Sequence, residues 1–312
     1  MPARKKPRPN NHSRTRPARR RRTAGAESTA GVGRPDTGRR APRTDPGEPG
    51  DPFGATTTRF VGGRHELGQN FLVDRRVVDR IVTLVRSRPG PIVEWGTGDG
   101  ALTRSLVALR RPLTGIEIDP RRARELNART PAHVRIRAGD LLEHAPPRGS
   151  VVVANIPFHL TTPALRHLLD GDGWSSAVLV VQWEVARKRA GVGGGTKMTA
   201  QSWPWYQFVL DRRVPASAFR PRPSVDAGIL VVDRRRRPLL GHDVAADYRS
   251  WVGRVFSGPG RGLADVLRRA GVPAATARRL ADATGRRSPL PRDLDAAGWV
   301  DAFRGARRRD RA

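Results

Sequence analysis

The sequence contains no cysteine, which excludes disulfide bonds and thiolate metal sites. We expect no metal centre, and a cysteine-free chain favours a reducing cytoplasm. No apolar run approaches the roughly 20 residues needed to cross a membrane, so we expect no membrane association. The N-terminus lacks the apolar core of a signal peptide, and its many prolines oppose the amphipathic helix of a transit peptide.

Lysine is also scarce, yet positive charge dominates the composition. Fifty-nine Lys and Arg residues against 29 Asp and Glu give a formal net charge of +30 and a pI of about 11.9. An excess of this size favours a polyanionic partner, with nucleic acid first. Because nearly all of these residues are arginine, codon bias in a GC-rich genome is an alternative source of part of the excess. Codon bias would reduce the number of arginines with a role in binding, but the electrostatic potential of the protein would still be positive.

The composition divides the chain of 312 residues into three parts. Residues 1–58 are rich in Arg, Pro, Gly, Ser and Thr and predict a disordered basic tail. The tail either attracts phosphates or is a dispensable extension, and both interpretations remain open. Order is expected from Arg59, and a change from strand patterns to helical patterns predicts a domain boundary near residue 235. Residues 59–235 and 236–312 are then two folded units.

Strand and helix patterns alternate in the first folded unit. Asp74 is expected to cap a helix whose apolar face carries Val77, Val78, Ile81, Val82 and Val85. Strands are expected at residues 92–95, 114–118, 134–137, 151–154 and 177–181, and two more at 205–210 and 228–232. A βαβαβ series predicts an α/β fold with a parallel, doubly wound sheet and right-handed crossovers.

The second folded unit has only helical patterns. The first predicted helix carries Tyr248 to Val255 behind a cap at Asp243, and the second carries Leu263 to Leu267 and ends at Gly271. A last helix carries Leu294 to Phe303. We therefore expect a small helical domain at residues 236–312.

A glycine-rich turn follows the first strand of the alternating series. Gly96, Gly98 and Gly100 stand where glycine lets a backbone approach a ligand closely. A dinucleotide site has glycines at the first, third and sixth positions, whereas here they occupy the first, third and fifth, which weakens that interpretation. Glu117, about twenty residues on and at a strand end, is placed to accept hydrogen bonds from ribose. Its alternative is a surface carboxylate, and Asp119 is expected to cap the next helix instead.

Polar residues also follow the next two strands. Gly139 and Asp140 predict either a turn or a contact with the amine of an adenosine. The stretch from Val151 to Phe158 reads as a buried strand that ends in Asn155, a proline and an aromatic ring. An amide and an aromatic ring at the carboxyl end of a parallel strand suit a flat polar ligand such as a nucleobase. The alternative for Asn155 is a turn cap.

These motifs, taken in order, resemble those of a known family. The series consists of Gln69-Asn70-Phe71-Leu72, Glu94 to Gly100, Glu117, Gly139-Asp140 and Asn155 to Phe158. It resembles the rRNA adenine N6-methyltransferases that use S-adenosylmethionine, and most of all the Erm type. Further matches are His65 to Phe71, Val181 to Lys188, Trp203 to Tyr206 and Phe219 to Asp226. The resemblance covers about residues 59–235 and is specific as a set.

The resemblance implies a Rossmann-like, class I S-adenosylmethionine-dependent methyltransferase fold with a small C-terminal helical domain. The implied activity is methyl transfer to N6 of an adenine in 23S rRNA, which confers macrolide, lincosamide and streptogramin B resistance. The implied protein is a cytoplasmic monomer whose partner is large-subunit rRNA. The implied cofactor contacts come from Gln69, Asn70, Leu72, Gly96, Gly98, Glu117, Asp140 and Asn155.

The resemblance also implies the catalytic residues. The amide oxygen of Asn155 and the carbonyl of Pro157 or of a neighbouring residue accept hydrogen bonds from the target amine, while Phe158 stacks on the base. Phe158 stands where many relatives have Tyr, so stacking is available without a hydroxyl contact, and Trp95 replaces a small aliphatic residue. No general base is required before attack, so His159 is expected to be a bystander.

Basic side chains flank the predicted site and are candidates for phosphate contacts, although each is individually a solvated charge in the alternative interpretation. These candidates are Arg187, Lys188, Arg189, Lys197, Arg220 and Arg222. The C-terminal helical unit is expected to add shape and charge recognition.

Three other functions are compatible with the fold. A small-subunit rRNA adenine dimethyltransferase is the nearest, and Trp203 to Tyr206 favours the large subunit over it. A non-catalytic RNA-binding or transcription factor is expected to have eroded motifs, which this chain does not. DNA adenine methyltransferases usually place Asp where Asn155 stands.

Overall fold

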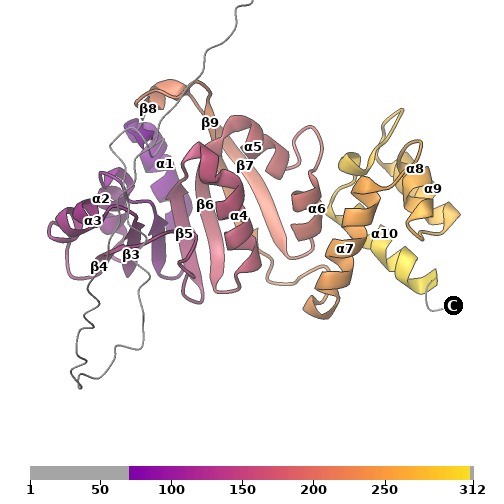
Figure 1. Cartoon of the computed structure of the whole chain (residues 1–312), viewed down its shortest axis with the longest axis horizontal. Coiled ribbons are helices and arrows are strands. Elements are labelled where there is room, and N and C mark those ends of the chain that lie inside the picture. The colour runs from indigo at the N-terminus through magenta and orange to yellow at the C-terminus, as the bar shows by residue number, and fades with distance from the viewer. Residues whose placement is uncertain (1–69, 310–312) are drawn as a thin grey trace, which may run out of the picture. The chain divides into compact units, whose positions relative to one another are not determined.

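The computed structural model describes residues 70–309, so the predicted tail at 1–58 and Gln69 lie outside the described residues. A seven-stranded sheet has the strand order β4-β3-β2-β5-β6-β9-β7, and β1 and β8 form a separate pair (Figure 1). The strands are β1 Phe71–Leu72, β2 Ile92–Trp95, β3 Leu113–Glu117, β4 Val134–Ala138, β5 Ser150–Asn155, β6 Trp174–Gln182, β7 Tyr206–Val214, β8 Phe219–Arg220 and β9 Ala227–Arg234. The α-helices are α1 Arg75–Arg86, α2 Ala101–Leu106, α3 Pro120–Asn127, α4 Thr161–Asp170, α5 Trp183–Arg189, α6 Lys197–Ser202, α7 Ala245–Ser257, α8 Leu263–Arg269, α9 Ala274–Ala283 and α10 Ala296–Arg309.

The sheet is parallel over five strands and antiparallel over the last two. Strands β4, β3, β2, β5 and β6 pair in parallel, as the alternating pattern predicts. Strand β9 is antiparallel to both β6 and β7, so a fully parallel sheet is not what forms. Neighbouring parallel strands need a long crossover, and residues 215–226 between β7 and β9 contain only a 3-10 turn and the short β8.

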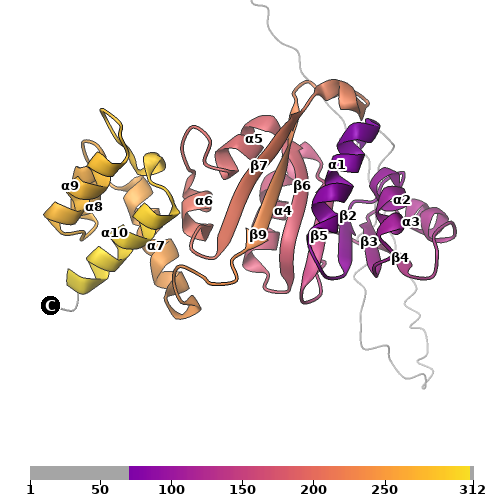
Figure 2. The same cartoon turned by 180° about the vertical axis from the view of Figure 1, so that it is seen from behind.

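Both faces of the sheet are covered, which explains the continuous apolar run in β5. Val151 and Val153 belong to the core shared with α1, whereas Val152 and Ala154 belong to the core shared with α4. All four are at most 1% exposed. Figures 1 and 2 show α4 and α1 on opposite faces of the sheet. A strand buried on both sides loses the alternation of apolar and polar residues, as this one does.

Helix starts follow the predicted caps at two of three positions. Asp74 caps α1 by accepting a hydrogen bond from Arg76 N at 2.8 Å, and Asp119 caps α3 by accepting from Arg121 N at 2.9 Å. The prediction for Asp243 is wrong. Asp243 lies inside a 3-10 turn, and α7 begins two residues later without a side-chain cap.

The C-terminal helices differ from the prediction in two places. The helix α9 was not predicted, because alanine and arginine dominate it and Leu280 is its only large apolar side chain. Leu294 precedes α10 and is 4% exposed, so it packs in the core from outside the helix. Gly271 follows α8 with a φ of +91°, a left-handed conformation that suits the predicted glycine stop.

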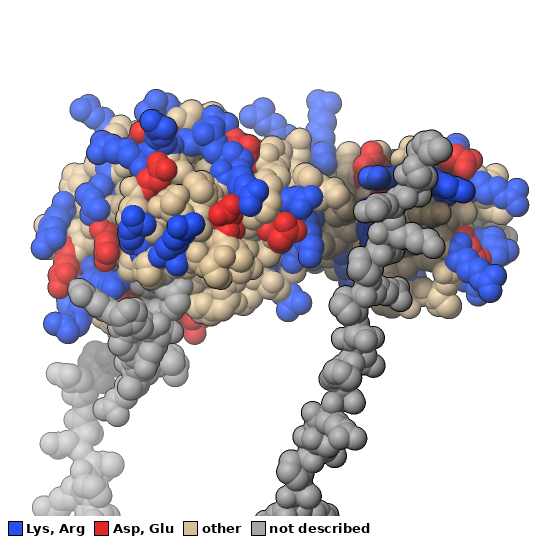
Figure 3. Space-filling view, turned by 90° about the horizontal axis from the view of Figure 1, so that it is seen from above, with Lys and Arg blue, Asp and Glu red and all other residues tan. Residues whose placement is uncertain are grey.

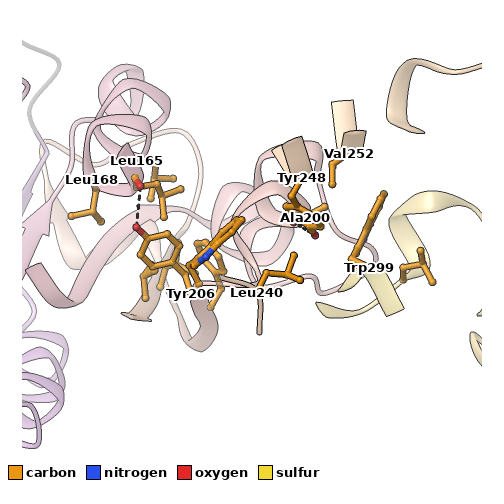
Figure 4. Close-up of a cluster of buried hydrophobic side chains, with 14 of the residues drawn as sticks. Leu165, Leu168, Ala200, Tyr206, Leu240, Tyr248, Val252 and Trp299 are labelled. Carbon is orange, nitrogen blue, oxygen red and sulfur yellow. Dashed lines mark hydrogen bonds between the residues drawn. The ribbon is translucent and has the colours of Figure 1, made fainter. Parts of the chain in front are cut away.

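One apolar core continues from the sheet into the C-terminal helices. It includes Leu165 and Leu168 of α4, Tyr206 of β7, Tyr248 of α7 and Trp299 of α10 (Figure 4). Two tyrosine hydroxyls find buried acceptors in it: Tyr206 Oη donates to the carbonyl of Leu169 at 3.0 Å, and Tyr248 Oη donates to that of Ala200 at 2.8 Å. In residues 70–309, no helix combines the length and apolar composition that a membrane crossing requires.

Candidate active site

A pocket opens at the carboxyl ends of β2 and β5. It brings together seven of the predicted site residues: Asn70, Leu72, Gly96, Gly98, Asn155, Pro157 and Phe158. Its other lining residues are Phe71, Glu94, Thr97, Asp99, Ala101, Leu102 and Ile156. Glu117 and Asp140 do not line this pocket, and Gln69 lies outside the described residues. Within residues 70–309 no cluster of His, Asp or Glu side chains is arranged to hold a metal ion.

The glycine turn lets the backbone form the floor of the pocket. Gly96 and Gly98 have φ values of +74° and +52°, a conformation that L side chains rarely adopt. A Cβ atom on Gly96 would meet nothing within 4 Å, so this glycine faces open space. A Cβ on Gly98 would come within 3.0 Å of the Phe71 ring. The turn is therefore exposed at Gly96 and covered by β1 at Gly98.

Glu117 supports the glycine turn from behind. Its side chain is 1% exposed, which contradicts the alternative of a surface carboxylate. Oε2 accepts a hydrogen bond from Gly98 N at 2.7 Å, and Oε1 accepts one from Asp119 N at 3.2 Å. Each carboxylate oxygen has a second lone pair beyond these bonds, and the buried side chain lies outside the lining of the pocket. The next residue, Ile118, is 39% exposed and offers an apolar surface for a flat ring, a feature that sequence reasoning missed.

Asp140 follows β4 and supports a turn. Its Oδ1 atom accepts a hydrogen bond from Leu142 N at 2.8 Å, the contact expected of the turn interpretation. The side chain is half-buried. In the β3–β4 pair, Glu117 stands opposite Ala138, the last residue of β4. Asp140 lies two residues after Ala138 along the chain.

Glu94 is a second buried carboxyl group, and sequence reasoning did not single it out. It lines the pocket, is 1% exposed, and its Oε2 accepts a hydrogen bond from Thr103 Oγ1 at 2.7 Å. Burial raises the pKa of Glu94 to about 8, the Thr103 hydrogen bond opposes that rise, and the nearby charge of Glu117 adds to it. An acidic residue inside the otherwise apolar strand Ile92–Trp95 was the available signal.

Asn155 is the last residue of β5 and faces β1. Its Nδ2 donates a hydrogen bond to the backbone carbonyl of Asn70 at 2.7 Å. Because a carbonyl oxygen only accepts, the amide nitrogen occupies this side and Oδ1 remains an acceptor on the other. Pro157 and the half-buried Phe158 follow, with Phe158 opening a 3-10 turn at the pocket wall. His159 in the same turn is exposed, and it is absent from the described pocket lining.

Trp95 fills the end of β2 beneath the turn. It is 1% exposed, its Nε1 donates to His144 Nδ1 at 3.4 Å, and its ring lies 5.6 Å from that of His167. Burial lowers the pKa of His144, and the charge of Arg137 lowers it further. The large ring is thus accommodated on the α4 side of the sheet, away from the described pocket lining.

The predicted phosphate contacts are spread over three elements. Lys188, Lys197, Arg220 and Arg222 are exposed, whereas Arg187 is half-buried and pairs with Glu184 at 3.2 Å. Arg220 stands opposite Phe71 in the β1–β8 pair, next to the pocket wall. Arg189 instead donates to Thr196 Oγ1 at 2.6 Å and supports the following loop. Figure 3 shows basic side chains outnumbering acidic ones on the visible face.

Comparisons with known proteins agree on one family. Residues 62–284 match the model of the ribosomal RNA adenine dimethylase family. The mycinamicin-resistance protein MyrB of Micromonospora griseorubida is 51% identical over 254 residues, which cover 79% of this chain and 80% of that protein. An rRNA adenine N-6-methyltransferase of Corynebacterium diphtheriae is 47% identical over 211 residues, covering 67% of this chain and 83% of that one. The crystal structure of the 23S rRNA methyltransferase ErmE superposes with a TM-score of 0.69 at 31% identity, covering 76% of this chain and 100% of that one.

Proposed function

The chain belongs to the ribosomal RNA adenine dimethylase family and is an S-adenosylmethionine-dependent rRNA (adenine-N6)-methyltransferase, and we propose that its substrate is an adenine of 23S rRNA. Methylation at that adenine confers resistance to macrolide, lincosamide and streptogramin B antibiotics. The observation that carries the proposal is the shared pocket. The Asn155 to Phe158 motif and the glycine turn open into the same space, so a base and a methyl donor can meet there.

The residues of the pocket fit the cofactor. Gly96 leaves open space at the turn, and Glu117 keeps acceptors for ribose beside the exposed Ile118. Leu72 and Asn70 close one side of the pocket, where we place the methionine part. The resemblance adds Gln69 to these contacts, and that residue lies outside the described residues. Asp140 takes the adenine amine through the lone pairs that Leu142 N leaves free. S-adenosylmethionine supplies a methyl group that its sulfonium already activates.

The target base is held by the motif at the end of β5. Oδ1 of Asn155 and the carbonyl of Pro157 or of a neighbouring residue accept hydrogen bonds from the N6 amine, and Phe158 stacks on the ring. The Pro157 carbonyl already accepts a hydrogen bond from Leu160 N at 2.8 Å, so it would use its second lone pair. An aromatic amine is a poor nucleophile because its lone pair is delocalised, and acceptors at both hydrogens favour a more pyramidal nitrogen. Fixed alignment of nitrogen and methyl group can supply about 7–11 kcal/mol of the barrier reduction. Phe158 adds about 1–3 kcal/mol of stacking towards the extruded base.

The wider assignments rest on charge and composition. Arg187, Lys188, Lys197, Arg220 and Arg222 are the proposed phosphate contacts, supported by exposure of all but Arg187. We place the catalytic domain at 59–235 and an RNA-binding helical domain at 236–312, since every regular element after β9 is helical. A basic tail at 1–58 adds non-specific attraction to RNA. We place the protein in the cytoplasm and away from membranes, because its rRNA substrate is there. We also propose that it acts as a monomer.

The test is methyl transfer to defined RNA. Full-length protein is incubated with labelled S-adenosylmethionine and either 23S or 16S rRNA stripped of ribosomal proteins. The expected result is label at adenine N6 in 23S rRNA alone, with loss of transfer in Asn155→Ala. Label confined to 16S rRNA would establish the small-subunit dimethyltransferase instead. Absence of label in both RNAs would contradict the proposal.

A further inference from the structure

Asn155 makes a contact that methyl transfer does not require. Its Nδ2 donates to the carbonyl of Asn70, 85 positions earlier in the sequence. Asn70 immediately precedes β1, and the contact is only half-buried. The same side chain therefore has two separate polar ends: the oxygen is available to a substrate, and the nitrogen is bound to the protein's own backbone.

Strand β1 is a wall of the cofactor pocket. The Phe71 ring covers Gly98, and the guanidinium of Arg122 lies 5.2 Å from the centre of that ring. Leu72 is 3% exposed and lines the pocket. The far edge of β1 is held by β8, and Val73 N donates to the carbonyl of Ala218 at 2.8 Å. The near side is held by Asn155, so the wall is attached at both edges.

We propose that Asn155 is also a latch, whose amide nitrogen holds β1 closed over the cofactor pocket. The inference rests on the proposed function only for the identity of the cofactor. A latch of this kind requires a donor, and asparagine supplies one while keeping an acceptor for the target amine. Aspartate keeps the acceptor but turns a carboxylate oxygen towards the Asn70 carbonyl, and two acceptors at this distance repel. Alanine removes the donor without repulsion and leaves the half-buried carbonyl open to water.

These differences predict an unusual order of affinities. In calorimetry of the full-length protein with S-adenosylhomocysteine and no RNA, Asn155→Ala is expected to bind about threefold more weakly than wild type, because the wall loses one attachment, and the isosteric Asn155→Asp about tenfold more weakly. Hydrogen exchange at the Val73 amide reports on the wall itself. We expect it to accelerate in both variants, and more in Asn155→Asp. Transfer to RNA plays no part in either measurement.

A matched control separates the latch from added negative charge. The exposed Asn127 uses its oxygen, which accepts a hydrogen bond from Ile136 N at 2.8 Å, so Asn127→Asp keeps that bond. It should bind S-adenosylhomocysteine as wild type does. Wild-type affinity and Val73 exchange in Asn155→Asp would overturn the latch and leave the proposed methyltransferase activity untouched. If Asn155→Asp does not fold, unchanged Val73 exchange in Asn155→Ala overturns it equally.

Discussion

At the scale of single residues, the proposed role of Phe158 is to hold the target base. The ring lines the pocket, packs against the apolar core on its other side and carries no hydroxyl, so stacking is the contact we propose it makes with the base. Phe158→Leu is expected to lower kcat/KM for rRNA by about ten- to a hundredfold, which corresponds to about 1–3 kcal/mol, whereas Phe158→Tyr keeps the ring and stays near wild type. Single-turnover methylation of protein-free 23S rRNA measures both. Equal losses in the two variants would contradict the stacking role, because Phe158→Tyr retains the ring.

Glu94 predicts a pH dependence of stability. Its pKa of about 8 in the folded protein exceeds the ordinary carboxyl value because the group is buried. Between the two pKa values the folded state keeps a proton that the unfolded state releases, so this contribution is complete below the unfolded pKa and is lost as pH rises through about 8. Glu94→Gln retains an acceptor for Thr103 Oγ1 and removes the titration.

The measurement is the difference in unfolding free energy between wild type and Glu94→Gln without ligand. We expect the wild type to lose stability relative to the variant from pH 5 to pH 9, by a few kcal/mol. Each unit by which the pKa is raised corresponds to about 1.4 kcal/mol of unfolding free energy. A difference that stays constant over this range would show that Glu94 ionises normally inside the fold.

At the scale of elements, the glycine turn allows the proposed cofactor site to be tested separately from backbone conformation. Gly96→Ala and Gly149→Ala place a side chain at φ values of +74° and +75°, and neither Cβ meets an atom within 4 Å. Both should lose about 1–2 kcal/mol of stability from the left-handed conformation. Of the two glycines, Gly96 alone faces the proposed cofactor pocket, since Gly149 precedes β5 at the opposite end of the strand.

Thermal unfolding and calorimetry with S-adenosylhomocysteine test this pair together. The expected outcome is a similar loss of stability in both variants and loss of cofactor binding in Gly96→Ala alone. Retained binding in Gly96→Ala would place the cofactor elsewhere.

Elements were predictable where local chemistry alone determines them. The strand Ile92–Trp95 has the predicted limits and the helix Pro120–Asn127 begins directly after its predicted cap, because an apolar run and an Asp-Pro cap are complete within a few residues. The antiparallel placement of β9 and the existence of α9 depend on long-range pairing and on weak apolar patterning, and neither was predicted.

The same distinction applies to the site. Gly96, Gly98, Pro157 and Phe158 follow strand ends and Asn155 ends β5, so local patterns indicate them. Asn70 and Leu72 were predicted only from the family resemblance. Glu94 lies inside a strand, and its burial depends on the helix that carries Thr103. The bond between Asn155 and Asn70 joins segments 85 positions apart, which no local pattern could indicate.

At the scale of the whole molecule, the net charge of +30 predicts strongly salt-dependent RNA binding. Each phosphate contact to a single strand contributes about 0.7 to the slope of log K against log salt. The double substitution Arg220→Gln/Arg222→Gln removes two exposed cations beside the β1–β8 pair and should reduce the slope by about 1.4.

The control is Arg110→Gln/Arg148→Gln, which removes two exposed cations before the amino ends of β3 and β5 and should leave the slope unchanged. Binding of protein-free 23S rRNA between 50 and 300 mM salt, roughly the range in which counterion release is resolved, measures both. Equal changes of slope in the two variants would mean that the arginines act through their summed positive potential, as codon bias implies. Arg220 and Arg222 would then not be specific phosphate contacts.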